Sequence, residues 1–322
     1  MSVLVTGAGL IGGLAARLLA ARGERVVLAD LVAPAPAGDA AGRIVDATCD
    51  VADVAALDRL VTRHEVTAIV HTAAMLSTAI RRDPFEGARV NVLGVAACLD
   101  VARRRDLRRV VIASSATVVY SLFAGRAGEA RPIPEDAPMR LVGERPASLY
   151  AATKLAAEHL MLAYADSYGV DAVALRLAAV IGGSLERPTS VPGRLLAKLA
   201  EAAARGAAPD LDDPLLVWGG EEEFVDARDC ARAMIAALDA PAPRQRVYAI
   251  AEDEAYTLER FLAVAACALP GLAPVAPPAP STGFAGFPHR RPARSDLAAA
   301  RDELGFRCRH SLEDAIRYWT GA

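Results

Sequence analysis

Tyr150 and Lys154 lie four positions apart in the segment YAATK. At that spacing two side chains project from the same face of a helix. A free phenol has a pKa of about 10 and is a poor base near neutrality, but a neighbouring ammonium favours its ionised form. The pair could therefore pass a proton to or from the oxygen of a carbonyl or an alcohol.

The composition of the chain makes Lys154 informative. Of the 36 basic side chains only Lys154 and Lys198 are lysine, so arginine is the default cation of this chain. A lysine at position 154 indicates a need for a compact ammonium, which could also reach the ribose hydroxyl of a cofactor. A solvated pair on a surface helix is the alternative interpretation.

Ser114 and Ser115 directly follow the apolar run at residues 110–113, which is typical of a buried strand. A hydroxyl at the carboxyl end of a parallel strand faces the crevice where ligands bind. It could hydrogen-bond the reacting oxygen and hold it near Tyr150. We prefer Ser115 for this role, and the choice between the two serines stays open.

Three glycines form a second group of functional residues. Gly7, Gly9 and Gly12 have G-x-G-x-x-G spacing, with Leu10 and Ile11 between the last two, and they lie between an apolar strand and a helical pattern. Glycines there let the backbone turn tightly and approach a pyrophosphate, while the helix N-terminus supplies free N–H groups. The segment therefore predicts a dinucleotide site.

Asp30 ends the next predicted strand, 23 residues after Gly7. A carboxylate at this place can accept hydrogen bonds from both adenosine ribose hydroxyls, and it would repel a 2′-phosphate. Leu31 and Val32 follow it, so no adjacent arginine offers a phosphate site. The sequence favours NAD over NADP, with simple capping of the next loop as the alternative role for Asp30.

Strand and helix patterns alternate through the first half of the chain. Short apolar strands separated by helices imply a parallel sheet with both faces covered. We therefore predict an α/β fold, a Rossmann-type doubly wound parallel sheet with a smaller mixed C-terminal substrate lobe. The expected strands are 3–5, 25–29, 43–46, 68–71, 109–113 and 171–177, and the expected helices are 10–22, 53–64, 91–105 and 150–168.

The second half of the chain is less regular. Proline-rich stretches at 207–214 and 268–280 read as loops, and neither is long enough for a free interdomain linker. We expect the lobe to pack closely on the sheet domain. The predicted NAD-binding domain covers 1–176 with a return at about 222–252, and the substrate lobe covers 177–221 and 253–322.

Bulk properties exclude several classes of protein. With 53% hydrophobic residues the chain can build a large core, and a net charge of -3 gives no reason to expect nucleic acid or an anionic membrane as partner. No apolar run approaches the ~20 residues of a spanning helix. Five scattered cysteines without a C-x-x-C pair indicate neither a disulfide framework nor a metal site. We expect a cytoplasmic protein.

Several further motifs resemble the extended short-chain dehydrogenase/reductases, the group that contains NAD-dependent sugar epimerases and dehydratases. The match runs nearly from end to end and keeps the family's order. The segments that carry it are VLVTGAGLIG (3–12), CDV (49–51), HTAA (71–74), VNVLG (90–94), SSATVVY (114–120), YAATK (150–154), LRLAAVIGG (175–183), EFVDARDCARA (223–233) and ELGF…HSLEDAIRYW (303–319).

The resemblance implies roles for further residues. It implies that Tyr150 and Lys154 contact the cofactor as well as catalysing proton transfer, and it suggests a homodimer packed through helices around 91–105 and 150–168. The other cofactor contacts that it implies are Asp50, Val51, His71, Ala73, Ala74, Asn91, Leu177 and Val180, and the substrate contacts are Ser77, Ser115, Thr117 and Arg290.

Departures from the family pattern bear on the substrate. The glycine turn is one residue shorter than usual, and an extra valine places Val119 where a tyrosine is expected, with Tyr120 one position later. In the sugar-nucleotide members of the family that this chain resembles, an amide side chain usually contacts the substrate at the position of Ala179. Glu222 replaces an arginine that would clamp a diphosphate, and a carboxylate would repel that group. A substitute clamp from Arg290, Arg291 or Arg294 stays open.

These departures favour an oxidoreductase that acts on a secondary alcohol or ketone of a small, non-nucleotide substrate. The stretch HTAAMLS (71–77) is also similar to the L-threonine dehydrogenase-like branch, which handles small substrates. Two alternatives stay open: an NAD-dependent nucleotide-sugar epimerase or dehydratase, and a non-catalytic dinucleotide-sensing regulator.

Overall fold

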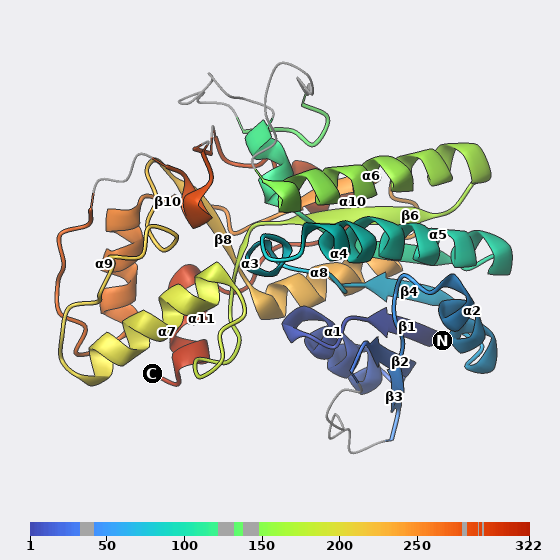
Figure 1. The fold of residues 1–322 in the computed structure, drawn as a ribbon, viewed down its shortest axis with the longest axis horizontal. Helices are drawn as coiled ribbons and strands as arrows, with labels where there is room; N and C mark the ends of the chain where they lie inside the picture. Colours follow the sequence, from blue (N-terminus) through green and yellow to red (C-terminus); the bar gives the residue numbers. More distant parts are fainter. Residues whose placement is uncertain (33–41, 122–131, 138–147, 279–281, 289, 292) are drawn as a thin grey trace.

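A seven-stranded sheet organises the N-terminal part of the molecule (Figure 1). The computed structural model describes residues 1–32, 42–121, 132–137, 148–278, 282–288, 290–291 and 293–322, so most of the loop at 33–42 lies outside the described residues. The strand order is β3-β2-β1-β4-β5-β6-β9 and every pairing is parallel. The strands are β1 (Ser2–Thr6), β2 (Arg25–Asp30), β3 (Ile44–Thr48), β4 (Ala68–His71), β5 (Arg109–Ser115), β6 (Ala172–Leu177) and β9 (Val247–Ile250).

Helices cover both faces of this sheet, which confirms the predicted fold class. Alternate strand residues point to opposite faces, so Val3 and Val5 pack in one core cluster and Leu4 in another. The first cluster lies under α1 (Leu10–Ala21), α8 (Ala227–Asp239) and α10 (Ala298–Leu304), and the second under α2 (Val54–Arg63), α5 (Gly94–Arg105) and α6 (Leu149–Tyr168).

Local sequence sets the start and the end of α6. The Ser148 hydroxyl accepts a hydrogen bond of 3.1 Å from the Ala151 N–H, which satisfies one of the free donors of the first turn. Gly169 ends the helix in the left-handed conformation at φ +69°, a position that favours glycine. Tyr150 and Lys154 therefore lie in the first two turns of a well-bounded helix.

A smaller lobe packs against the carboxyl ends of the strands. Its sheet has the order β10-β8-β7, formed by β10 (Ala255–Tyr256), β8 (Glu222–Asp226) and β7 (Ala179–Ile181). Its core is aromatic, and the Trp218 ring centroid lies 5.3–5.6 Å from those of Phe224, Phe261 and Phe284. The surrounding helices are α7 (Val191–Ala204), α9 (Leu258–Ala268) and α11 (Leu312–Thr320).

The structure refines the expected boundaries in two places. The helix expected at 91–105 begins as a π-helical turn at Arg89–Leu93, preceded by the short helices α3 (Ser77–Ile80) and α4 (Pro84–Ala88). We predict that residues 222–252 return to the NAD-binding domain. In the structure β8 joins the small sheet, whereas β9 pairs in the large sheet and α8 packs on one of its faces. The division into two domains otherwise stays a prediction.

Candidate active site

A cavity of about 910 Å³ lies at the carboxyl ends of the central strands, between the sheet and the lobe. It brings together eleven of the residues predicted from the sequence: Gly9, Leu10, Ile11, Gly12, Ala74, Ser77, Ser115, Thr117, Tyr150, Leu177 and Val180. The other predicted residues lie behind this wall or away from it: Gly7, Asp30, Asp50, Val51, His71, Ala73, Asn91, Lys154 and Arg290.

The glycine turn has the shape that a dinucleotide requires. Gly7 has φ +90°, and a Cβ there would lie 2.5 Å from the Ala73 backbone nitrogen. A Cβ on Gly12 would lie 1.9 Å from the Gly7 carbonyl oxygen, so only glycine fits this crossing. Gly9, in contrast, has no heavy atom within 4 Å of the place of its Cβ and lines the cavity at the start of α1. This leaves room for a diphosphate at the helix N-terminus.

Asp30 fixes the turn and keeps acceptor capacity. One carboxylate oxygen accepts a hydrogen bond of 2.7 Å from the Ala8 N–H, and the other accepts one of 2.6 Å from the Leu31 N–H. Each carboxylate oxygen has two acceptor sites, so both can still receive a ribose hydroxyl. Leu31 and Val32 are exposed and uncharged. The residues at the end of β2 therefore fit the adenosine ribose of NAD.

The segment that contains the predicted cofactor contacts Asp50 and Val51 is held by an ion pair. Arg89 Nη1 lies 2.8 Å from Asp50 Oδ2, and Asp50 Oδ1 accepts a hydrogen bond of 2.9 Å from the Ala52 N–H. Val51 is buried, and its side chain would lie 2.9 Å from a Cβ on Gly94. The Asp50 side chain is thus oriented by Arg89, and its contact with the cofactor stays a prediction.

Tyr150 and Lys154 lie in the first two turns of α6, beside the end of β5. Tyr150 lines the cavity, and the Lys154 nitrogen lies 5.7 Å from the centre of its ring. Burial raises the pKa of Tyr150 to about 12, and its hydrogen bond with Ser115 lowers that pKa in part. Burial also lowers the pKa of Lys154 to about 8. Burial and the Ser115 hydrogen bond, rather than the charge of Lys154, shift the pKa of Tyr150, so the lowering by Lys154 that the sequence predicts is not found.

The two serines at the end of β5 have different surroundings. Ser114 is buried and donates a hydrogen bond to Glu158, which also forms a buried ion pair with Arg176. Ser115 lines the cavity, and its oxygen accepts hydrogen bonds from the backbone N–H and the hydroxyl of Thr117, at 3.2 and 3.0 Å. Because Ser114 is already engaged, this arrangement supports Ser115 as the partner of Tyr150.

His71 and Asn91 lie behind the cavity wall. His71 Nδ1 is 2.7 Å from the Thr6 hydroxyl, and burial followed by the Lys154 charge lowers the pKa of His71 to about 3, so this side chain is neutral. The Asn91 amide accepts from the Met75 N–H at 2.8 Å and donates to the Met75 carbonyl and the Thr153 hydroxyl, each at 3.1 Å. It holds the segment after β4 against α6, and its role toward the cofactor stays a prediction.

A buried charged network forms the wall at the lobe end of the cavity. Glu222 lines the cavity, yet it accepts a hydrogen bond from the Tyr120 hydroxyl and lies 3.5 Å from Arg291 Nη1. Arg291 is also ion-paired with Glu223, and all three charged side chains are at most 3% exposed. Burial raises the pKa of Glu222. The sequence pattern did not reveal that Arg291 neutralises Glu222.

The three arginines left open as a substitute clamp lie apart from the cavity surface. Arg291 is locked between the two glutamates. Arg294 donates a hydrogen bond of 2.7 Å to the Asp253 carbonyl. Arg290 is exposed and lies against Gly220, so its contact with the substrate stays a prediction.

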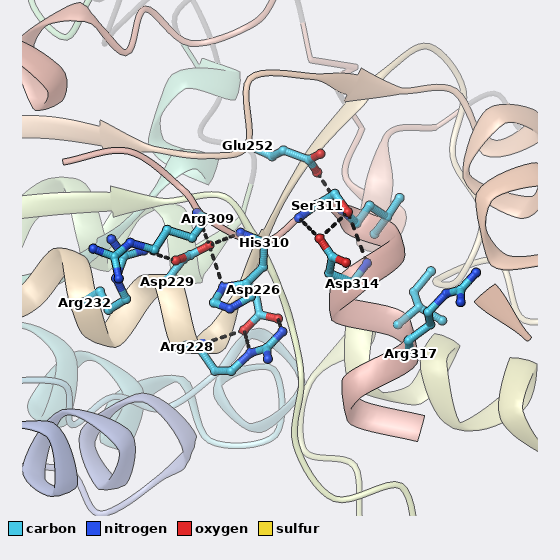
Figure 2. Close-up of polar contacts among 12 residues, drawn as sticks. Asp226, Arg228, Asp229, Arg232, Glu252, Arg309, His310, Ser311, Asp314 and Arg317 are labelled. Atoms are coloured by element: carbon cyan, nitrogen blue, oxygen red, sulfur yellow. Dashed lines mark hydrogen bonds and ion pairs between the residues drawn. The ribbon is translucent and has the colours of Figure 1, made fainter. Parts of the chain in front are cut away.

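The C-terminal helix adds a cavity residue that the motifs did not single out. Trp319 of α11 lines the cavity and lies against Gly182, where a Cβ would be 2.8 Å from its ring. Figure 2 shows how the segment before α11 is anchored: one oxygen of the fully buried Asp229 accepts hydrogen bonds from the Arg309 and His310 N–H groups, each at 2.9 Å. Glu252 accepts another, of 3.0 Å, from the Leu312 N–H.

Comparison with known proteins places this arrangement in a family. The family model described as "NAD dependent epimerase/dehydratase family" matches residues 3–251, more than three quarters of the chain. The chain belongs to this family. It is an NAD-dependent enzyme of the short-chain dehydrogenase/reductase type, and NAD is its cofactor.

Relatives within the family differ in substrate. The chain is 26% identical to a UDP-glucose 4-epimerase of Corynebacterium glutamicum over 81% of its length and 78% of that protein. It is 27% identical to the mitochondrial L-threonine 3-dehydrogenase of Bos taurus over 74% of its length and 61% of that protein. The structure of the Thermus thermophilus UDP-glucose 4-epimerase in complex with NAD matches with a TM-score of 0.76 and 28% identity, covering 100% of this chain and 98% of the other.

The described residues lack two other kinds of feature. No helix there combines the length and the apolar character needed to cross a bilayer. Within the same residues, no cluster of three or more histidine, cysteine, aspartate or glutamate side chains is arranged to hold a metal ion.

Proposed function

We propose that this enzyme is an oxidoreductase that transfers hydride between NAD and a secondary alcohol or ketone of a small, non-nucleotide substrate. The observation that carries the proposal is the closed network of Glu222, Arg291 and Glu223 at the lobe end of the cavity. A diphosphate bound there would meet a carboxylate, and the nearest guanidinium is already committed to two carboxylates. Taking Arg291 from them would leave buried charges unpaired, which is costly.

Hydride transfer is assigned to the cofactor, and the proton transfer that accompanies it is assigned to Tyr150, Ser115 and Lys154. Bound NAD supplies the hydride acceptor or donor. Tyr150 takes the proton of the substrate hydroxyl during oxidation and returns it during reduction, while Ser115 hydrogen-bonds the same oxygen. Lys154, fixed by its hydrogen bond of 2.8 Å to the Ala113 carbonyl, provides positive charge behind Tyr150 that stabilises the phenolate formed during proton transfer.

Calorimetry with nucleotide sugars tests the proposed substrate class. Holoenzyme loaded with NAD is titrated with UDP- and dTDP-sugars, with UDP and dTDP as controls for the nucleotide portion. We expect no heat of binding at micromolar concentrations. Binding of any of these sugars with a micromolar Kd would overturn the assignment and favour the alternative.

That alternative is epimerisation or dehydration of a nucleotide sugar with NAD retained through the cycle. The similarity to the C. glutamicum epimerase over most of both chains favours it. The two functions differ in what happens to the cofactor, because an epimerase regenerates NAD within each turnover and releases no NADH. Product analysis after many turnovers would therefore distinguish them.

We also infer a homodimer packed through α5 and α6. These helices lie side by side (Figure 1), and large apolar side chains on and beside them are exposed. Leu93 is 55% exposed, Leu162 is 40% exposed and Tyr168 is 60% exposed. Light scattering on Leu162→Glu beside the unaltered protein tests this, since a charge within an apolar interface should shift the mass from two chains to one. A cytoplasmic location stays a prediction.

A further inference from the structure

We propose that Arg17 and Arg187 form a two-sided clamp on the diphosphate of the bound dinucleotide. Both line the cavity and they come from different elements, Arg17 from α1 and Arg187 from the loop between β7 and α7. The inference concerns the established cofactor and holds for either substrate class. Neither residue belongs to the glycine motif.

Arg17 lies along the first turns of α1. Its Nη1 is 3.6 Å from the place that a Cβ on Gly13 would occupy, so its guanidinium reaches back along the helix toward the N-terminus. Long side chains on a helix lean in this direction. Arg17 lines the cavity together with Gly9 and Gly12. It thus adds a full positive charge to the N–H groups that the glycine turn presents.

Arg187 belongs to a loop that passes over the start of the same helix. A Cβ on Gly183, in this loop, would lie 3.7 Å from Leu10 Cδ2, and Leu10 is the first residue of α1. The loop is held by a hydrogen bond of 3.3 Å from the Arg187 N–H to the Ser184 hydroxyl. Arg187 also lines the cavity. Arg187 therefore lines the same cavity as Arg17, from the loop that leads into the lobe.

The charges of the two arginines are not balanced by the protein. Neither side chain has an acidic partner within 4 Å among the described residues, although many other arginines of this chain form ion pairs. Within that described part of the chain they are the cations that line the cavity, and its carboxylate, Glu222, is paired with Arg291. A diphosphate carries about two negative charges, and guanidinium groups bind such oxygens in bidentate geometry.

The position of the pair favours the cofactor over the substrate. Arg17 lies on α1 directly after the glycine turn, where the family motif holds a dinucleotide, and the loop of Arg187 approaches the start of that helix at Gly183. The reacting groups, Ser115 and Tyr150, come instead from the ends of β5 and α6. A clamp at the glycine turn would also link the sheet domain, through Arg17, to the loop that leads into the lobe, through Arg187.

Binding measurements without substrate test the clamp. Arg17→Met, Arg187→Met and the double variant are titrated with NADH, ADP-ribose and adenosine, the last of which lacks phosphate. Arg63→Met, an exposed arginine at the end of α2, serves as the matched control. We expect each cavity substitution to raise the Kd of NADH and ADP-ribose about five- to thirtyfold, because charge-assisted hydrogen bonds are lost. Adenosine binding and the control should be unchanged.

Salt dependence and a conservative variant sharpen the result. The NADH affinity of the unaltered protein should fall with ionic strength more steeply than that of the double variant, and Arg187→Lys should recover part of the loss. An unchanged Kd for NADH in the double variant would overturn the proposal. So would an equal loss for adenosine, since the effect would then not depend on the diphosphate. Neither outcome depends on which substrate the enzyme takes.

Discussion

The ammonium of Lys154 donates a hydrogen bond of 2.8 Å to the carbonyl oxygen of Ala113. Ala113 lies two residues before Ser115 on β5, so the contact fixes the N-terminal half of α6 against the strand that carries this serine. Tyr150, four residues earlier on the helix, reaches the cavity at Ser115. The three groups assigned to proton transfer are therefore positioned as one packed unit.

Substitution Tyr150→Phe removes the proton-transfer group while keeping the ring. We expect kcat/KM to fall by about 10²- to 10⁴-fold, the usual contribution of a positioned acid or base, with the Kd of NADH unchanged within about twofold. Steady-state kinetics and fluorescence titration measure the two quantities. Tyr164→Phe, on the same helix but outside the cavity, is the matched control. A Tyr150→Phe enzyme with more than half of the original kcat/KM would contradict the assignment.

Substitution of Lys154 tests whether its charge assists Tyr150. Lys154→Met removes the ammonium, and we expect kcat/KM to fall roughly 100-fold at pH 7. Because the pKa of Lys154 is lowered to about 8, its charge is lost as the pH rises through that value. The ratio of the two enzymes' kcat/KM should therefore shrink between pH 7 and pH 9. A ratio that is independent of pH over this range would show that Lys154 acts through packing alone.

The cofactor preference is predicted to depend on the charge of Asp30. Asp30→Asn removes the charge and leaves a single acceptor oxygen for the two N–H groups of Ala8 and Leu31. We expect the Kd of NAD to rise about tenfold, which corresponds to about 1.4 kcal/mol. NADP should lose less, because the repulsion of its 2′-phosphate disappears. Calorimetry with both cofactors should thus show a smaller preference, whereas an unchanged ratio of Kd values would contradict this role.

Gly12 is predicted to be intolerant of any side chain. In Gly12→Ala the new methyl group would lie 1.9 Å from the Gly7 carbonyl oxygen, so the turn must move. Such overpacking typically costs about 1–3 kcal/mol, and we expect a lower Tm and a loss of NADH binding. Gly9→Ala is the matched control for stability, since no heavy atom lies within 4 Å of its Cβ. Equal Tm values for the two variants would be inconsistent with this packing.

Glu252 should make stability depend on pH near neutrality. Burial raises the pKa of Glu252 to about 7, above the ordinary value of 4.5. The folded state thus favours the protonated form, and the stability that this proton contributes is lost as the pH rises from about 4.5 through 7. Compared with Glu252→Gln, the original protein should lose free energy of unfolding between pH 5 and pH 8 in urea denaturation. Parallel pH profiles for the two proteins would refute the linkage.

The parts of this molecule that sequence could predict are those with local patterns. The glycine turn, Asp30 and the Tyr150–Lys154 pair each depend on spacing within one strand–helix unit, and the structure places them at the ends of neighbouring elements. Local patterns could not predict which side chains surround Glu222. Its partners Tyr120 and Arg291 lie 102 residues before it and 69 residues after it. Only the folded lobe shows that its charge is paired.

Cavity residues supplied by the lobe were also hidden from the sequence. Trp319 reaches the cavity because Asp229, on α8, binds the backbone of the segment that precedes α11. Arg187 lies in a loop without regular structure, where no periodic pattern marks the direction of a side chain. For Arg187 the available signal is its place four residues after the glycine pair Gly182 and Gly183. Trp319 contacts Gly182 only in the folded chain, so the sequence offers no such signal for it.

Accumulation of NADH with non-nucleotide alcohols would establish the proposed oxidoreductase activity. The enzyme is mixed with NAD and a panel of hydroxy acids, amino alcohols and sugar acids, and nicotinamide absorbance is followed beside the ketone formed, with Tyr150→Phe in parallel. We predict that at least one compound yields NADH and ketone in equal amounts over many turnovers, and that the variant yields neither. The proposed function would be wrong if no compound in the panel yielded NADH while a nucleotide sugar was epimerised or dehydrated without net reduction of NAD.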